Sequence, residues 1–234
     1  MKARFRYTKH GKVRFASHRD LARILERSLR RVGVPVCYSQ GFSPRPRLSF
    51  GLALPTSFES DGEYFDADLV EAIDPDRLTG PLSEALPDGV DVTAAMAVLP
   101  GAGSLQQLVS SCSWRLHLSG VPIQELSARV GRLLDAAALP LERSRKGSRA
   151  TVDVRPRILH LGIEGPTADG VALSADLGIA NVAVRPSELV ELLGPDVALL
   201  RGCRLHQWIT VDGARAELPP VPGPATRHTE RRAS

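Results

Sequence analysis

The feature that most constrains the fold is an order of predicted elements that occurs twice along the chain. Apolar and basic residues alternate in ARFRYTK (3–9), which predicts a half-buried strand. Helical spacing of apolar residues predicts a helix at 17–32, where Ser17 and Asp20 form an N-terminal capping pattern and Gly33 suits the residue that ends it. The buried stripe of this helix is expected to consist of Leu21, Ile24, Leu25, Leu29 and Val32.

The rest of the chain extends this order. In the first half, strands are predicted at 34–39, 48–54, 62–71 and 89–98, with a short helix from Asp74 to Leu86. In the second half, strands are predicted at 113–120, within 149–163, at 171–178 and at 204–213, and helices at 122–137 and from Pro186.

Each half therefore has a strand–helix–strand–strand–helix–strand pattern. We expect an α+β protein built from two tandem ferredoxin-like (βαββαβ) units with antiparallel sheets. The units are expected at 1–99 and 108–213, with a linker at 100–107. Residues 214–234 are rich in proline and charge, which predicts a disordered tail.

Charge is distributed unevenly along the sequence. Residues 1–50 carry 13 Lys and Arg against 2 Asp and Glu, a net charge of +11. Residues 51–109 carry 1 against 11, a net charge of −10, and residues 143–157 carry 6 against 1, a net charge of +5. Basic clusters attract phosphates, most often those of nucleic acid. The alternative is that the acidic block neutralises the basic block within one fold.

The predicted helix at 17–32 carries arginines at three- and four-residue steps, mostly opposite its apolar stripe. Arginine binds phosphate through paired hydrogen bonds, so this face suits a phosphate backbone. The alternative is an ordinary solvated face. Together with the loop that follows, the residues expected to contact phosphate are Arg14, Arg19, Arg23, Arg27, Arg45 and Arg47.

The stretch YSQGFSPRPRLSF (38–50) places two arginines between two prolines, after a glycine and two aromatic residues. Pro44 and Pro46 stiffen the backbone, and a stiff loop loses little entropy when it binds. Its aromatic rings would then stack on bases. The alternative is a rigid connector whose aromatic residues face the core. The candidates for base contact or for shaping a pocket are His18, Tyr38, Gln40 and Phe42.

A second basic patch is expected where RKG resembles a hairpin turn between basic strands. Its residues are Arg145, Lys146, Arg149 and Arg155. No GxxxxGK[ST] or GxGxxG motif is present, so ATP or dinucleotide binding has no motif support. Asp66 and Asp68 share one face of the predicted strand at 62–71 and would suit Mg²⁺, but a solvent-facing edge that discourages sheet pairing is the favoured interpretation.

The sequence favours neither a metal site nor a disulfide. Cys37, Cys112 and Cys203 are far apart with no CxxC pair, and we expect each to be a small buried side chain. The six histidines form no HxH or HxxxH pair. No stretch approaches the about 18 apolar residues of a membrane helix, and no signal peptide is recognised, so a cytoplasmic protein is expected.

Four short motifs between Lys9 and Tyr64 resemble one family. They are K-x-G-x-x-R-F-x-S-H-x-D, E-R-x-x-R-R-x-G-x-P, Y-S-x-G-F-x-P-x-P-x-x-S-F and E-S-x-G-E-Y. This pattern is similar to the radical-SAM-linked family of uncharacterised bacterial proteins, the DUF2344 domain, and the segment with Arg145, Lys146, Asp153 and Arg155 also fits. Arg45 is one departure, because relatives often have histidine before the second proline.

The resemblance implies a partner: a radical SAM protein with a cobalamin-binding-type domain. That partner would carry the [4Fe–4S] cluster, S-adenosylmethionine and, in such a domain, cobalamin. The present chain has no CxxxCxxC motif and is expected to hold no cofactor. We therefore expect a non-catalytic accessory protein that binds structured RNA, either tRNA or rRNA, for a partner that modifies or processes it. The alternatives are a metal-independent RNA-processing enzyme that uses His18, and a docking subunit without RNA contact.

Overall fold

The computed structural model describes residues 1–145, 148–179 and 183–219, with the side chains of residues 145 and 148 left out. The strands of its first half are β1 (Lys2–Lys9), β2 (Leu48–Phe50), β3 (Glu59–Asp68) and β4 (Val92–Val98). Those of the second half are β5 (Val109–Ser119), β6 (Pro140–Arg145), β7 (Ser148–Asp153), β8 (Ile158–Thr167), β9 (Gly170–Gly178), β10 (Ala198–Val211) and β11 (Ala214–Glu217). The helices are α1 (His18–Val32), α2 (Thr79–Ala85), α3 (Leu105–Leu108), α4 (Ile123–Asp135) and α5 (Pro186–Leu193).

Within the described residues, one nine-stranded sheet extends through both halves. Its main path runs β4-β1-β3-β10-β5-β9-β8, while β2 pairs with β3 and β11 pairs with β10. The pairings are antiparallel except that between β3 and β10, which is parallel and joins the two halves through Cys203 with Glu59 and Arg204 with Ser60. Strands β6 and β7 form a separate hairpin. The prediction of an α+β protein with a mostly antiparallel sheet is confirmed.

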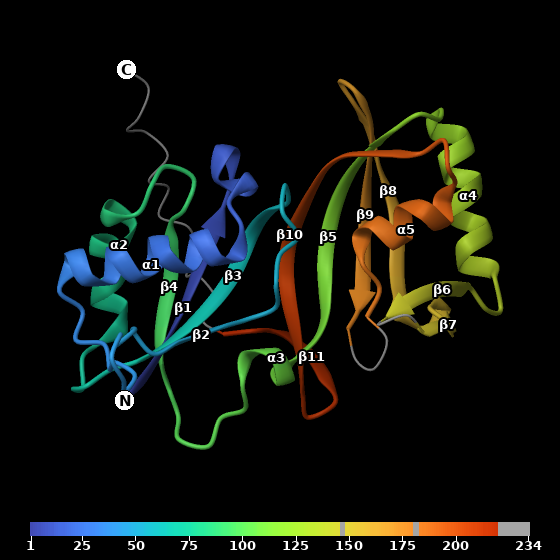
Figure 1. The fold of residues 1–234 in the computed structure, drawn as a ribbon. Coiled ribbons are helices and arrows are strands. Elements are labelled where there is room, and N and C mark those ends of the chain that lie inside the picture. Colours follow the sequence, from blue (N-terminus) through green and yellow to red (C-terminus); the bar gives the residue numbers. More distant parts are fainter. Residues whose placement is uncertain (146–147, 180–182, 220–234) are drawn as a thin grey trace.

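The helices form two groups on the sheet. Figure 1 shows α1 and α2 over the strands of the first half, and α4 and α5 beside those of the second half. Each group encloses its own hydrophobic core. Phe5, Phe65 and Leu25 are buried in the first, and Trp114, Leu116 and Leu126 in the second. In the described part of the chain, no helix combines the length and apolar character needed to cross a membrane.

The local signals at the ends of the helices are confirmed. The Ser17 side chain accepts a hydrogen bond from the Asp20 backbone N–H at 3.2 Å, and Gly33 ends α1 in the left-handed conformation with φ of 75°. Leu21, Leu25 and Leu29 of the predicted stripe are buried, while Ile24 and Val32 are half-buried. The helix signals at Asp74 and Pro186 are also found, with Asp74 capping a 3₁₀ turn before α2 and Pro186 opening α5.

Three element predictions are wrong. Residues 34–39 form no strand but only isolated bridges, Val36 with Leu69 and Tyr38 with Pro46. The predicted linker at 100–107 contains the start of α3. The predicted tail begins with β11. Leu218 behind it is fully buried in the core of the second half, and its backbone N–H donates to the Gln207 carbonyl. Residues 220–234 of that tail lie outside the described residues.

The second half is attached to the first through a close contact at Gly202. A Cβ atom placed on Gly202 would lie 2.2 Å from Cε1 of Phe58, whose ring packs edge-to-face on Trp114 at 5.7 Å. Gly202→Ala should therefore lower the free energy of unfolding by about 1–3 kcal/mol through overpacking. Urea denaturation measures this change.

Gly131→Ala is the matched control, because this glycine lies within α4 and an added Cβ meets nothing within 4 Å. It should leave stability unchanged or raise it by about 0.5–1 kcal/mol, since alanine is the better helix former. Equal effects of the two substitutions would contradict the contact described for Gly202.

Candidate nucleic-acid interface and the adjoining pocket

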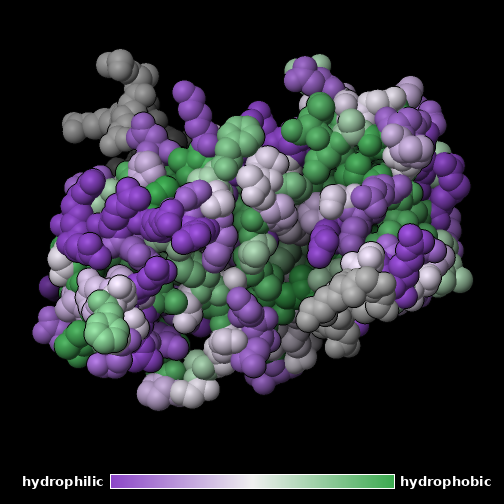
Figure 2. All heavy atoms as spheres, in the orientation of Figure 1, coloured by the Kyte–Doolittle hydropathy of each residue, from purple (hydrophilic) through white to green (hydrophobic). Residues whose placement is uncertain are grey.

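The exposed face of α1 carries a row of arginines. Arg19, Arg27 and Arg30 are exposed, and the described structure gives their side chains no ion pair or hydrogen bond. Arg23 lies 3.6 Å from Asp20, an exposed pair of the kind that contributes little. Figure 2 shows hydrophilic side chains gathered over α1. This surface, which we call the arginine face, therefore has guanidinium groups available to a ligand.

Besides Arg23, two further arginines predicted to contact phosphate have partners within the protein. Arg14 lies 3.4 Å from Glu59 and packs over the Phe15 ring at 4.6 Å. Arg47 lies 3.3 Å from Asp68, although its own side chain is largely exposed. Arg45 is exposed, and no side-chain partner is found for it among the described residues. The structure thus separates the predicted set into paired residues and available ones.

The loop that follows α1 is closed by its own backbone. The Ser39 N–H donates to the Arg45 carbonyl at 2.9 Å, and the Ser39 hydroxyl accepts from the Arg45 N–H at 3.1 Å. At the tip of this loop, Gln40 is exposed and the Phe42 side chain is fully exposed, while Tyr38 near its base is 42% exposed. The interpretation that these aromatic residues face the core is therefore wrong for Phe42.

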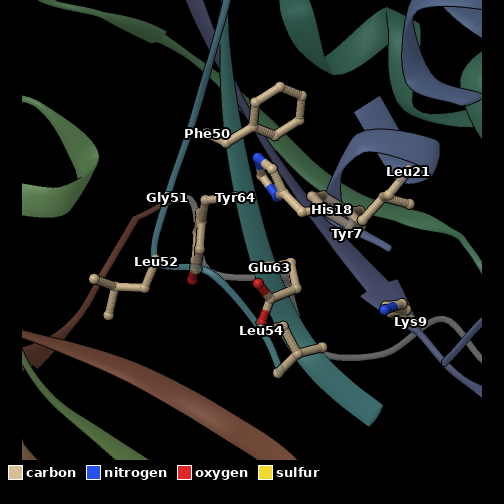
Figure 3. A pocket seen from close by; sticks show the side chains of 10 residues that line it. All are labelled: Tyr7, Lys9, His18, Leu21, Phe50, Gly51, Leu52, Leu54, Glu63 and Tyr64. Carbon is tan, nitrogen blue, oxygen red and sulfur yellow. The ribbon is translucent and has the colours of Figure 1, made fainter. Parts of the chain in front are cut away.

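A small pocket begins where α1 starts. Figure 3 shows the His18 ring between Phe50 and Glu63 in that view. The His18 ring packs edge-to-face on Phe50 with a centroid distance of 4.9 Å. The lining residues come from β1, α1, β2, the segment after β2, and β3; they are Tyr7, Lys9, His18, Leu21, Phe50, Gly51, Leu52, Leu54, Glu63 and Tyr64. His18 thus connects the arginine face with the pocket.

The wall of the pocket contains a buried ion pair. Nη1 of Arg204 lies 3.1 and 3.2 Å from the two carboxylate oxygens of Glu63, and both side chains are almost fully buried. Arg204 also donates to the carbonyls of Leu52 and Ala53, at 3.1 and 2.8 Å, and packs over Trp114. Burial raises the pKa of Glu63, and the nearby Arg204 charge opposes that shift.

Two further buried groups flank Glu63. Burial raises the pKa of Tyr7 well above its ordinary value, with a further contribution from the charge of Glu63. The Lys9 ammonium donates to the carbonyls of Arg14 and Ala16, at 3.2 and 3.0 Å, and burial lowers its pKa. Lys9 therefore holds the turn before α1 and brings a positive charge close to the pocket.

Sequence reasoning identified His18 but missed the buried charges around it. Glu63 stands next to Tyr64 and Phe65 in a predicted strand, and a carboxylate beside large apolar residues was the one available signal. No pattern connects it with Arg204, which is 141 residues away. The pairing arises because β3 and β10 are neighbours in the sheet.

Several other predicted residues have structural roles or lie outside the described residues. Arg155 donates to the carbonyls of Leu134 and Ile158, at 2.6 and 3.1 Å, so it ties α4 to β8. Arg149 is exposed on β7. Lys146 and the side chain of Arg145 lie outside the described part of the chain. The second basic patch is therefore described only in part.

The predicted acidic edge is also corrected. At Asp66, strand β3 pairs with β1 on one side and β2 on the other, so it has no solvent-facing edge there. Asp66 is buried against Arg4 at 2.8 Å. Among the cysteines, Cys112 is buried as expected, whereas Cys37 and Cys203 are only partly buried.

The fold defines an α+β protein with a mostly antiparallel sheet and two groups of helices. The model of a family described as an uncharacterized protein conserved in bacteria (DUF2344) matches residues 2–186, and the chain belongs to this family. No curated protein matches the sequence.

The structure is also similar to a chain in the crystal structure of a Cbf5–Nop10–Gar1 complex. The TM-score is 0.51 and the sequence identity 7%. The match covers 88% of the present chain and 48% of the other, so the present chain spans about half the length of that neighbour. At this identity the likeness concerns the fold alone.

Replacing Arg204 tests the buried pair. Arg204→Met should lower the free energy of unfolding by about 3–5 kcal/mol, because it leaves the Glu63 charge buried without its partner. Arg204→Met/Glu63→Leu should recover part of this loss. Arg23→Met, which removes an exposed pair, should cost less than about 1 kcal/mol. Urea denaturation of the three variants measures the differences.

The destabilisation caused by Arg204→Met should depend on pH. Burial raises the pKa of Glu63 in the folded state, so protonation of Glu63 favours the folded protein. The destabilisation by Arg204→Met should be smallest below about pH 4, where Glu63 is neutral even when unfolded, and should grow as pH rises through its folded-state pKa. A penalty independent of pH would show that Arg204 acts only through its carbonyl contacts.

Proposed function

We propose that this chain binds structured RNA through the arginine face of α1 and the loop at 38–47. The observation that carries the proposal is a set of exposed guanidinium groups for which the described residues provide no partner: Arg19, Arg27, Arg30 and Arg45. A solvated face would normally mix charges of both signs, whereas α1 offers only Asp20 and Glu26 against its arginines. Guanidinium groups at helical spacing can contact successive phosphates of an RNA strand.

The loop supports RNA over a simple anion. Phe42 presents a fully exposed ring beside Arg45, on a loop that its own hydrogen bonds close. An exposed aromatic ring beside arginines suits a base stacked next to its phosphate. Because the loop is already closed, it loses little entropy on binding. Tyr38 and Gln40 are exposed on the same loop and would contact the same strand.

We further propose an accessory role beside a radical SAM enzyme, as the family resemblance implies. In this arrangement the partner carries the [4Fe–4S] cluster, S-adenosylmethionine and cobalamin, and the present chain supplies the tRNA or rRNA. The order of elements supports two tandem ferredoxin-like units as the scaffold, since each half places two helices on a four-stranded arrangement, β4-β1-β3-β2 and β10-β5-β9-β8.

A second candidate function is RNA processing at the pocket. His18 faces a pocket that also contains Glu63, Lys9 and Tyr7. A histidine at the end of a phosphate-binding surface is suited to proton transfer. Under this alternative, His18→Ala abolishes RNA cleavage and leaves RNA affinity nearly intact. Under the accessory role, purified protein leaves RNA unchanged with or without His18.

The arginine face is tested by its salt dependence. Arg19→Gln/Arg23→Gln/Arg27→Gln should weaken RNA binding and reduce the slope of log affinity against log salt by about 2–3, one charge for each lost phosphate contact. The matched control is Arg77→Gln/Arg132→Gln/Arg201→Gln, which removes the same charge from exposed positions elsewhere. Fluorescence anisotropy with total tRNA and with rRNA fragments, between low and physiological salt, gives both slopes.

Equal slopes for the two triple variants would show that binding follows net charge rather than this surface. Absence of RNA binding by the wild-type protein would favour the docking subunit. Co-purification with the radical SAM partner after nuclease treatment would then support that role.

The loop is tested separately. Phe42→Ala should reduce RNA affinity by about 1–3 kcal/mol through lost stacking, with no change in the salt slope. Phe42→Trp should retain affinity, because tryptophan offers a larger ring. Crosslinking and sequencing in cells should recover fewer RNA contacts from the alanine variant. If both substitutions behave like the wild type, the ring contacts no base.

A further inference from the structure

Three residues that are distant in the sequence meet where the two halves of the sheet join. His10 follows β1, Asp61 lies in β3, and Cys203 lies in β10. These strands are neighbours, since Lys9 pairs with Ser60 and Cys203 pairs with Glu59. One imidazole nitrogen, one carboxylate oxygen and the thiol sulfur all lie within 4.8 Å of one another.

We propose that His10, Asp61 and Cys203 form a binding site for a divalent transition-metal ion, with Zn²⁺ as the expected occupant. Imidazole nitrogen, carboxylate oxygen and thiolate sulfur are the ligand atoms that zinc takes in proteins. A site with a sulfur and a nitrogen ligand disfavours Mg²⁺ and Ca²⁺, which prefer oxygen. Three protein ligands leave a fourth position of the tetrahedron for water or another ligand.

The cysteine distinguishes this group from an ordinary ion pair. Nε2 of His10 lies 2.9 Å from Oδ1 of Asp61, and this ion pair alone would not indicate a metal site. The Cys203 sulfur lies 3.7 Å from the carbonyl of the next residue and also contacts the backbone of Asp61, so the thiol already faces that ligand. A soft thiol therefore stands within reach of two ligands that already converge, and a metal ion would use all three.

The surroundings allow an ion to enter and hold the ligands in place. The side chains of His10 and Asp61 are 39% and 48% exposed, so the group is open to solvent. The backbone before and after it is held: Glu59 accepts a hydrogen bond from the Gly11 N–H at 3.0 Å, and the His10 N–H donates to the Gly89 carbonyl at 2.8 Å. The backbone that carries His10 is therefore fixed beside β3.

Charged groups of both signs face the site. Glu59 and Asp91 interact electrostatically with His10, while Arg6 and His206 interact electrostatically with Asp61. Arg115 acts on Cys203, but it is paired with Glu164 at 2.7 Å. Arg6 lies 3.0 Å from Glu217. Both arginines near the site are therefore paired with carboxylates. A cation at this position does not face uncompensated positive charge.

Cobalt is the direct probe of the site. The full chain is dialysed against a chelator and titrated with Co²⁺ while its absorption spectrum is recorded. We expect a thiolate-to-cobalt charge-transfer band in the near ultraviolet, with visible bands of a tetrahedral ion, both reversed by excess Zn²⁺. Cys203→Ser should abolish the charge-transfer band, and Asp61→Asn should weaken Co²⁺ binding at least tenfold. The matched control, Cys37→Ser, alters the other half-buried cysteine and should retain the band.

A second measurement needs only the wild-type protein. Zn²⁺ should slow the alkylation of Cys203 by iodoacetamide at least tenfold and leave the alkylation of Cys37 unchanged, as peptide mass spectrometry resolves. Zn²⁺ should also raise the thermal midpoint of the wild type and not that of Cys203→Ser. Absence of the cobalt band in the wild type, its persistence in Cys203→Ser, or equal alkylation of Cys203 with and without Zn²⁺ would overturn the proposal. None of these outcomes depends on RNA binding.

Discussion

The buried ion pair between Glu63 and Arg204 is the interaction on which the rest of the structure depends. Strands β3 and β10 share only two paired positions, yet this contact makes one continuous sheet of the two halves. Arg204 strengthens it by binding the carboxylate and two carbonyls of the segment after β2. A buried charge without its partner costs several kcal/mol, so the pair couples the stability of the two halves.

The contacts of β3 with its neighbours also determine which basic side chains remain free to bind a ligand. Strand β3 supplies carboxylates to arginines of neighbouring segments, as Asp66 does for Arg4 and Glu59 for Arg14. The neutralisation of the basic block by the acidic block is therefore real within the sheet. It does not extend to α1, whose arginines lie on the far side of that helix from the core. Apart from Arg47, which pairs with Asp68 of β3, the proposed RNA surface is the part of the basic block that does not pair with the sheet.

Much of the fold could be predicted because its signals are local. The boundaries of α1 follow from Ser17 and Gly33, since a cap and a left-handed glycine act within a few residues. The strand predicted at 34–39 failed because its neighbours in space, rather than its composition, decide whether it pairs. The burial of Leu218 was missed for the same reason, because its partners are Gln207 and Tyr64.

The sequence by itself determined the α+β class, the family motifs and the candidates on α1 and its loop, because periodicity, caps and charge density are properties of short segments. Only the tertiary structure decided which arginines are free, since pairing depends on contacts across the sheet. It also decided that Glu63 meets Arg204 and that His10, Asp61 and Cys203 converge. Those contacts join residues more than 50 positions apart in the sequence. The residues next to each of them in the chain do not indicate which distant residue it will contact.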